Sequence, residues 1–308
     1  MILPGGDAVT IHIVTVPYRY DDYMDGLGRG PVALLRAGLQ SRLKAAGIDS
    51  TAPRESKLPD DERVEGPIAA NIGALGRHTA TLVSEALSDG NPVLVLAGDD
   101  TASIGVVSGV QLATEGKRLG LVWIDAHADF NTPETSFSGI LAGMTVAILA
   151  GLAGPIWREA ANLKYTIPTD QILIAGLRAT DEKELALLQS TAIRIVEAKS
   201  PRRSELYENA LDKLMAHVDV VVVNIDLDVL DPQYVPSAST PEANGLSVRQ
   251  AAWMVNQVTR RGKTAAVCVT SLNPRAGGLG ERSVNSTLAL LEQALVDWKI
   301  DESVNADA

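Results

Sequence analysis

The sequence predicts an α/β fold with three layers, in which helices cover both faces of a mostly parallel central sheet. Short β-branched runs alternate with longer helical stretches, which is the pattern of repeated βαβ units. The chain has 308 residues, of which 46% are hydrophobic but only 4% aromatic. Strands rich in Ala, Val, Leu and Ile are typical of a parallel sheet that is buried on both faces.

The alternation defines seven expected strands and seven expected helices. The strands are 9–16, 93–97, 121–125, 171–176, 192–196, 218–226 and 264–271. The helices are 31–46, 66–88, 103–114, 181–189, 202–217, 247–260 and 283–298, with Pro31 and Ser247 as start residues. Residues 50–66, rich in Pro, Asp and Glu, are expected to form a loop. Because the same rhythm continues on both sides of this loop, residues 1–308 are expected to form a single domain.

Composition and charge exclude several classes of protein. The formal net charge of −11 argues against nucleic acid or an anionic membrane as a partner. The one cysteine, Cys268, lies in an apolar run, which indicates a buried structural thiol rather than a disulfide or a cysteine-rich zinc site. The first residues show neither a basic region followed by an apolar stretch nor a twin-arginine pattern, so no signal peptide is expected, and no apolar segment approaches the roughly 20 residues of a membrane span. A cytoplasmic location is expected.

Acidic residues follow three of the expected strands, in residues 97–100, 123–129 and 224–228. Ligands of open α/β sheets gather outside the carboxyl ends of the strands. A single Asp-x-Asp at such a place is often only a turn or a helix cap. Three acidic strand ends would bring together carboxylates that repel one another and need cations. The oxygen ligands and one imidazole favour manganese, with magnesium or another divalent ion as the alternative.

The three strand ends carry distinct sequence motifs. Residues 97–101 read Ala-Gly-Asp-Asp-Thr, residues 125–133 read Asp-Ala-His-Ala-Asp-Phe-Asn-Thr-Pro, and residues 226–232 read Asp-Leu-Asp-Val-Leu-Asp-Pro. In this order they resemble the ureohydrolase family of arginases, agmatinases and formiminoglutamases, from about Gly26 to Pro274. The stretch after Asp129 is closest in wording to the arginase-related hydroxyarginine hydrolases.

The resemblance implies a two-metal site with six ligands, namely Asp100, Asp125, His127, Asp129, Asp226 and Asp228. Asp125 and Asp226 would bridge the two ions, Asp129 would complete the first, and His127 with Asp228 the second. Asp231 would support the ligands from behind. Two such ions acidify a shared water, which attacks the planar carbon of an amidine or guanidine.

The resemblance also implies a clamp for an α-amino acid. Asn131, Ser136 and Ser138 occupy the positions that hold the α-carboxylate in arginases, although Ser and Asn also favour turns. Asp181 and Glu184 occupy the positions that receive the α-amino group, although acids at a helix start also serve as caps. Both halves in register favour an α-amino-acid substrate over a decarboxylated amine such as agmatine.

Three positions depart from the family pattern: Asp100 and Ala142 each replace a histidine, and Ser271 replaces a glutamate that clamps the guanidinium. Five carboxylates exceed the charge of two divalent ions by one, which should raise the pKa of the bound water. The missing glutamate removes a contact worth roughly 1.5–3 kcal/mol, so plain arginine is a doubtful substrate. The resemblance implies that the histidine at the position of Ala142 shuttles protons in the family. None of the remaining histidines, His12, His78 and His217, is an evident replacement for it.

Three hypotheses follow. The first is an amidinohydrolase of an arginine-like amino acid such as N-hydroxy-arginine, releasing urea or a substituted urea, with Thr240 and Ser271 lining the pocket beside Asp125 and His127. The second is a catalytically silent relative that acts as a binding or regulatory partner. The third is a hydrolase of a formimino-amino acid. A small-molecule substrate and a homo-oligomeric assembly are expected.

Overall fold

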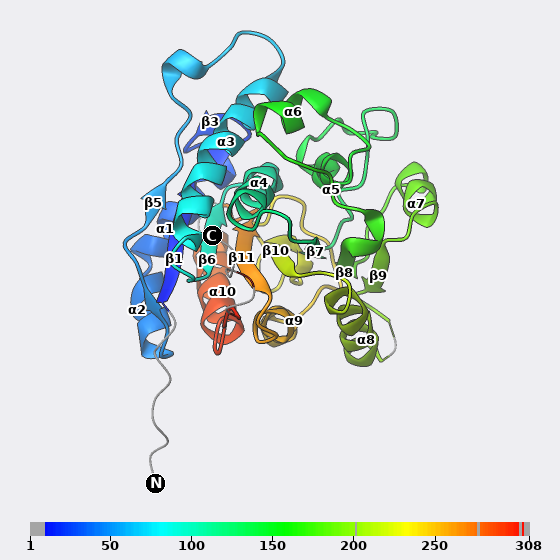
Figure 1. Ribbon diagram of the computed structural model, residues 1–308. Coiled ribbons are helices and arrows are strands. Elements are labelled where there is room, and N and C mark those ends of the chain that lie inside the picture. Colours follow the sequence, from blue (N-terminus) through cyan, green and yellow to red (C-terminus); the bar gives the residue numbers. More distant parts are fainter. Residues whose placement is uncertain (1–9, 201, 276–277, 302–303, 305–308) are drawn as a thin grey trace.

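One nine-stranded sheet forms the centre of the computed structural model, which describes residues 10–200, 202–275, 278–301 and 304 (Figure 1). Its strands are β1 (Thr10–Val16), β4 (Asp49–Ser50), β5 (Arg54–Glu55), β6 (Val93–Ala97), β7 (Leu119–Ile124), β8 (Ile172–Leu177), β9 (Arg194–Glu197), β10 (Val220–Asp226) and β11 (Thr264–Thr270). They are ordered β4-β1-β6-β11-β10-β7-β8-β9, with β5 also beside β1, and every pair is parallel. The predicted α/β class with a mostly parallel sheet is confirmed.

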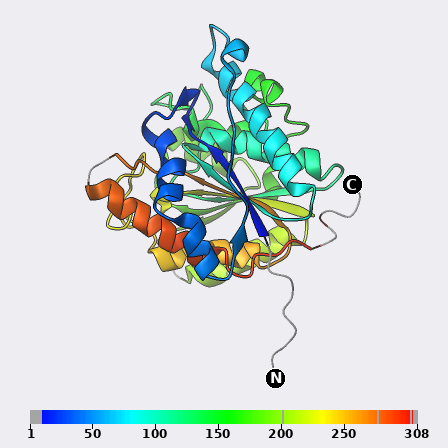
Figure 2. The same ribbon diagram turned by 90° about the vertical axis from the view of Figure 1, so that its left-hand side faces the viewer.

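Helices form a layer on each face of this sheet, and Figure 2 shows the strands fanning out between the two layers. One face packs against α1 (Gly30–Arg36), α2 (Leu39–Ala45), α8 (Arg203–Met215), α9 (Val248–Thr259) and α10 (Gly278–Ala294). The other packs against α3 (Ile68–Leu87), α4 (Ser103–Ala113), α5 (Thr145–Leu149), α6 (Pro155–Ala160) and one end of α7 (Glu182–Gln189). The expected three layers are therefore present.

The central strands are apolar along their whole length because each is covered on both faces. In β10, Val221 and Val223 belong to one buried cluster, whereas Val220 and Val222 belong to the other. Successive side chains of a strand point to opposite faces, so alternate residues enter different cores. Two residues of this strand are polar, namely Asn224, which has no exposed surface, and Asp226 at its end.

Several predicted boundaries were wrong. The expected helix 31–46 is two helices, α1 and α2, because Gly38 adopts the left-handed region at φ +89°. Residues 50–66 contain strand residues that pair with β1 rather than loop alone. The short helices α5 and α6 were missed because one turn leaves almost no periodic signal. Helix α10 begins at Gly278 and ends at Ala294, earlier than expected at both ends.

The other boundaries agree within a few residues, and Val9, the expected start of the first strand, lies outside the described residues. None of the described helices combines the length and the apolar character that crossing a membrane requires.

A two-residue hairpin after β1, formed by β2 (Tyr18–Arg19) and β3 (Asp22–Tyr23), is held against the end of β6. A Cβ atom at Gly98 would lie 1.9 Å from the carbonyl oxygen of Tyr18, so only glycine permits this approach. The backbone N–H of Tyr20 then donates to Asp99 Oδ2 over 2.8 Å. These contacts bring Arg19 and Tyr20 to the edge of the sheet where the acidic motifs lie.

Candidate metal centre and its pocket

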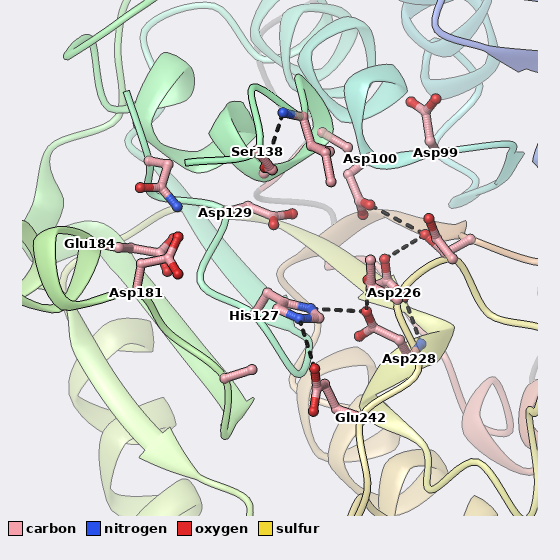
Figure 3. Close-up of a pocket in the computed structure, with 18 of the residues that line it drawn as sticks. Asp99, Asp100, His127, Asp129, Ser138, Asp181, Glu184, Asp226, Asp228 and Glu242 are labelled. Atoms are coloured by element: carbon pink, nitrogen blue, oxygen red, sulfur yellow. Dashed lines mark hydrogen bonds and ion pairs between the residues drawn. The ribbon is translucent and has the colours of Figure 1, made fainter. Parts of the chain in front are cut away.

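The acidic motifs meet at the carboxyl ends of four adjacent strands. Asp100 follows β6, Ser271 follows β11, Asp226 ends β10, and Asp125 follows β7. These strands are neighbours in the order β6-β11-β10-β7, and Asp226 is paired in register with Thr270. The parallel sheet therefore brings together residues that lie far apart in the sequence (Figure 3).

Two groups of possible metal ligands are present among the described residues. Asp125, His127 and Asp228 each offer one ligand atom within 4.8 Å of the others, and so do Asp100, Asp125 and Asp129. The shared member, Asp125, lies between the two groups as a bridging ligand would. Ser271 Oγ connects Asp226 to Asp100, because it donates to Asp226 Oδ2 over 2.5 Å and lies 3.4 Å from Asp100 Oδ2. The charges of Asp228 and Asp125 also act on Asp226, so this residue lies close to both groups.

Turn hydrogen bonds explain the Asp-x-His and Asp-x-Asp spacing. Asp125 Oδ1 accepts from the backbone N–H of His127 over 2.7 Å, and Asp226 Oδ1 accepts from that of Asp228 over 2.6 Å. Trp123 Nε1 donates to Asp125 Oδ2 over 2.9 Å. The turn interpretation and the ligand interpretation are therefore compatible, since an aspartate that closes a turn has lone pairs left for a cation.

Electrostatics indicate that this cluster needs positive charge. Burial raises the pKa values of Asp100, Asp125, Asp129 and Asp226, and repulsion from neighbouring carboxylates raises them further. Burial opposes the charged form of His127, but Asp125 and Asp228 outweigh it and raise the pKa of His127 to about 12. The pKa values of these carboxyl groups and of the His127 imidazole are raised because negative charge is concentrated here, and bound cations would relieve this repulsion. The donor set of five carboxylates and one imidazole fits two divalent ions.

Five of the six predicted metal ligands line a cavity of about 570 Å³, and the sixth, Asp125, is buried and does not belong to its lining. Four of the five predicted clamp residues line this cavity, namely Asn131, Ser138, Asp181 and Glu184. Ser136 does not belong to the lining, and its hydroxyl accepts from the backbone N–H of Gly139 over 3.0 Å. In the view of Figure 3, Asp181 and Glu184 lie on one side of the pocket and Asp100 and Asp226 on the other.

The two acidic clamp residues differ in what they already bind. Glu184 is buried and accepts from the backbone N–H groups of Phe130 and Asp181. Asp181 is the N-cap of α7, but its side chain makes no capping hydrogen bond. The capping role therefore belongs to Glu184, and the exposed carboxylate of Asp181 is left for a ligand.

The carboxylate half of the clamp presents donors. Asn131 Oδ1 accepts from Thr135 Oγ1 over 2.8 Å, which leaves the amide NH2 group as the part that can meet a ligand. Ser138 Oγ accepts from the backbone N–H of Ile140 over 3.2 Å, so its own hydrogen remains available. Both arrangements suit an anionic group.

Arg178, Glu242, Arg19 and Tyr20 also line the pocket and were missed from the sequence. Arg178 donates to six backbone carbonyl oxygens, including those of Asp228 and Glu242, and so ties two loops of the site together. Glu242 Oε1 lies 4.0 Å from His127 Nε2. Only the position of Glu242, two residues after Thr240, could have indicated it, because loop residues without a spacing pattern carry no signal of their own.

The predicted site residues Thr240 and Ser271 both line the pocket, as do the departures Asp100 and Ala142. Thr240 Oγ1 donates to Asp228 Oδ2 over 2.8 Å. The histidines outside the motif have other partners: His12 contacts Asp89, His78 contacts Glu62, and His217 contacts a backbone carbonyl.

A parallel three-layer α/β fold with an acidic ligand cluster outside its central strands defines an enzyme of the metal-dependent hydrolase class. The sequence model described as the arginase family matches residues 9–296, so the chain belongs to the arginase family and is an amidinohydrolase by that membership. Arginase-1 of Oryctolagus cuniculus is 30% identical over 298 residues, which cover 91% of each chain.

Solved structures show the same fold. The arginase of Entamoeba histolytica, in complex with L-ornithine, superposes with a TM-score of 0.82 at 23% identity over 94% of this chain and 99% of that one. The formimidoylglutamase of Bacillus subtilis superposes with a TM-score of 0.72 at 16% identity, covering 99% of this chain and 89% of its own.

Proposed function

We propose that this protein uses two divalent ions, manganese in the first place, to hydrolyse a C–N bond in the guanidino or amidino group of an arginine-like α-amino acid, releasing urea or a substituted urea. The observation that carries the proposal is that one pocket contains both the acidic cluster and the uncommitted polar atoms of Asn131, Ser138 and Asp181. The ligands would be Asp100, Asp125, His127, Asp129, Asp226 and Asp228.

Each residue around the cluster has a distinct task. When bound, two divalent ions would supply a water of lowered pKa and polarise the group under attack. Thr240 orients Asp228, and Ser271 holds Asp226. The Asn131 amide and the Ser138 hydroxyl would bind the substrate carboxylate, and Asp181 its ammonium group. These contacts fix the substrate's amino-acid end, so that the reacting carbon reaches the cluster.

The metal end of the pocket favours a substrate other than plain arginine. Ser271 offers a hydroxyl where a guanidinium would need an anion, and Ala142 offers no titratable group. An N-hydroxylated guanidine such as that of N-hydroxy-arginine is less basic and carries its own titratable hydroxyl. It therefore depends less on both of the missing groups.

Two other functions have support in specific features. The changes at Asp100, Ala142 and Ser271 favour a silent relative that binds metal or ligand without turnover. The fold shared with a formimidoylglutamase supports a formimino-amino acid as the substrate.

Purified protein loaded with manganese and supplied with arginine, N-hydroxy-arginine, agmatine and formiminoglutamate separates these functions. We expect two bound ions per chain and release of hydroxyurea from N-hydroxy-arginine. Release of formamide from formiminoglutamate alone would move the assignment to the formimino substrate. Two bound ions without turnover of any compound would support the catalytically silent relative. The absence of bound ions would overturn the proposal of a metal centre.

A further inference from the structure

Behind Asp100, on the side away from the pocket, lies a small buried hydrogen-bond network. Asn224 Nδ2 donates to Asp100 Oδ1 over 2.9 Å, and Thr270 Oγ1 donates to the same oxygen over 2.7 Å. Ser103 Oγ donates to Asn224 Oδ1 over 2.8 Å. All three supporting side chains have no exposed surface. Two separate donors therefore converge on one oxygen of a carboxylate that lines the pocket with its other end.

The network fixes which oxygen of Asp100 remains available. Two hydrogen bonds engage Oδ1, whereas Oδ2 faces the site, 3.4 Å from Ser271 Oγ. The orientation of the Asn224 amide is also determined, because an ionised carboxylate only accepts and its neighbour must present the NH2 group. The Ser103 hydroxyl satisfies the amide oxygen at the opposite end.

The supporting residues belong to the rigid part of the fold. Asn224 lies in β10 and Thr270 ends β11, the two adjacent strands at the centre of the sheet, while Ser103 begins α4. Asn224 interrupts an otherwise apolar strand, and a buried polar side chain there is costly unless it is hydrogen-bonded. Its partners are Asp100 and Ser103, so its place in the strand serves this network.

We infer that Asn224 and Thr270 are positioning residues that hold Asp100 as a metal ligand acting through Oδ2 alone, with Ser103 fixing the Asn224 amide. The inference rests on the proposed two-metal function. A carboxylate at this place differs from an imidazole because it has a second oxygen. If that oxygen has no hydrogen-bond partner, the carboxylate can rotate or can bind the metal ion through both oxygens. Two donors on Oδ1 prevent both, so the aspartate and its supporting residues act together.

Thr270→Val tests the inference because valine keeps the shape of threonine and removes the hydroxyl. Manganese dissociation constants measured by titration calorimetry should show one of the two ions bound about tenfold to a hundredfold more weakly, the usual effect of losing a ligand's hydrogen-bond partner. Thr270→Ser should restore the affinity, and Asn224→Ala should weaken the same ion. Thr264→Val is the matched control, since Thr264 is equally buried in β11 but donates to the backbone oxygen of Val258.

A double substitution separates positioning from a general effect on the fold. In Asp100→Asn, which removes the ligand charge, adding Thr270→Val should change manganese affinity little. The inference would be overturned if Thr270→Val and Asn224→Ala bound manganese with unchanged affinity. It would also be overturned if Thr264→Val, or Thr270→Val in the Asp100→Asn background, lost as much affinity as Thr270→Val alone. Each of these results would leave the two-metal function standing. A wild-type protein that binds no manganese would overturn both.

Discussion

The two ends of the pocket differ in how far their polar groups are already engaged by the protein. At the metal end, Asp100 and Asp226 are buried, and Asn224, Thr270 and Ser271 donate to their carboxylates. At the clamp end, Asp181 is exposed and its side chain makes no capping bond. The carboxylates of the metal end are therefore held by hydrogen bonds within the protein, whereas the Asp181 carboxylate is exposed and makes no capping hydrogen bond.

This difference indicates where the chain can change without losing its fold. The three departures from the family pattern, at Asp100, Ala142 and Ser271, all line the pocket, and Asp100 and Ser271 belong to its metal end. The side chains of Asp100 and Ser271 are hydrogen-bonded within the protein, and that of Ala142 has no polar atom that would need a partner. Under the proposed function, the chemistry at the ions and the recognition of the amino acid would therefore be separate properties, and a substitution could change one and leave the other.

Substitution of a central ligand should give the largest effect. Asp226→Asn removes a charge beside both ligand groups, so at least one ion should be lost. Metal ions supply several kcal/mol of transition-state stabilisation, so the rate should fall by about a thousandfold or more. Metal content and initial rates check this. Asp219→Asn, which changes an aspartate paired with Arg118 just before the same strand, should keep both ions; two ions at full rate in Asp226→Asn would contradict the ligand assignment.

Substitution in the clamp should change binding and spare the chemistry. Asp181→Asn removes the negative charge offered to the substrate's ammonium group, a contact worth roughly 1.5–3 kcal/mol. KM for the amino-acid substrate should rise about tenfold to a hundredfold while kcat and metal content stay unchanged. Glu182→Gln, the neighbouring residue outside the pocket lining, is the control. A fall in kcat at constant KM would place Asp181 in the chemistry instead.

Replacing the extra carboxylate should shift the pH dependence of the rate. Asp100→His removes one negative charge from the site and should lower the pKa of the bound water, moving the rising limb of the pH–rate profile down by roughly one unit. Binding of softer divalent ions such as zinc should strengthen relative to manganese. The profile of kcat/KM against pH is the measurement, and a limb that stays or moves up would refute the charge argument.

The smallest effect concerns the metal-free protein. The pKa values of Asp100, Asp125, Asp129 and Asp226 are raised by burial and repulsion, so the folded state holds protons that the unfolded chain releases near pH 4. Their stabilisation is full below that pH and is lost as pH rises through the raised values. The raised pKa of His127 acts in the same direction, from the unfolded value near 6.5 up to about 12.

Without metal, the melting temperature should therefore fall between pH 5 and pH 8, by roughly 2–4 °C for each kcal/mol lost. Thermal unfolding in the presence of a chelator measures this slope. Manganese should reverse the trend, because protons compete with the ions for the same oxygens. A metal-free protein that becomes more stable as the pH rises across this window would contradict the assignment of the raised values.

The sequence by itself determined most of the sheet and predicted which acidic residues would gather at one edge of it. The apolar runs of β6, β7 and β10 are each followed within a few residues by an aspartate. Parallel strands place such ends at one edge of the sheet, so Asp100, Asp125 and Asp226 could be grouped without coordinates. The resemblance to arginases predicted Asn131, Ser136 and Ser138 as clamp residues, and of these Asn131 and Ser138 line the pocket. Such motifs can be recognised in the sequence because their residues lie close together along the chain.

Only the tertiary structure decided which side-chain atoms of these residues are hydrogen-bonded within the protein and which remain available to a ligand. The hairpin that brings Tyr20 to the pocket and the loop that places Glu242 near His127 depend on contacts between distant segments. Asn224 and Thr270 read as ordinary strand residues until their neighbours in the sheet show that both donate to Asp100. Hydrogen-bond partners are set by which strands lie side by side, and strand order is a property of the packed sheet rather than of any segment of the chain.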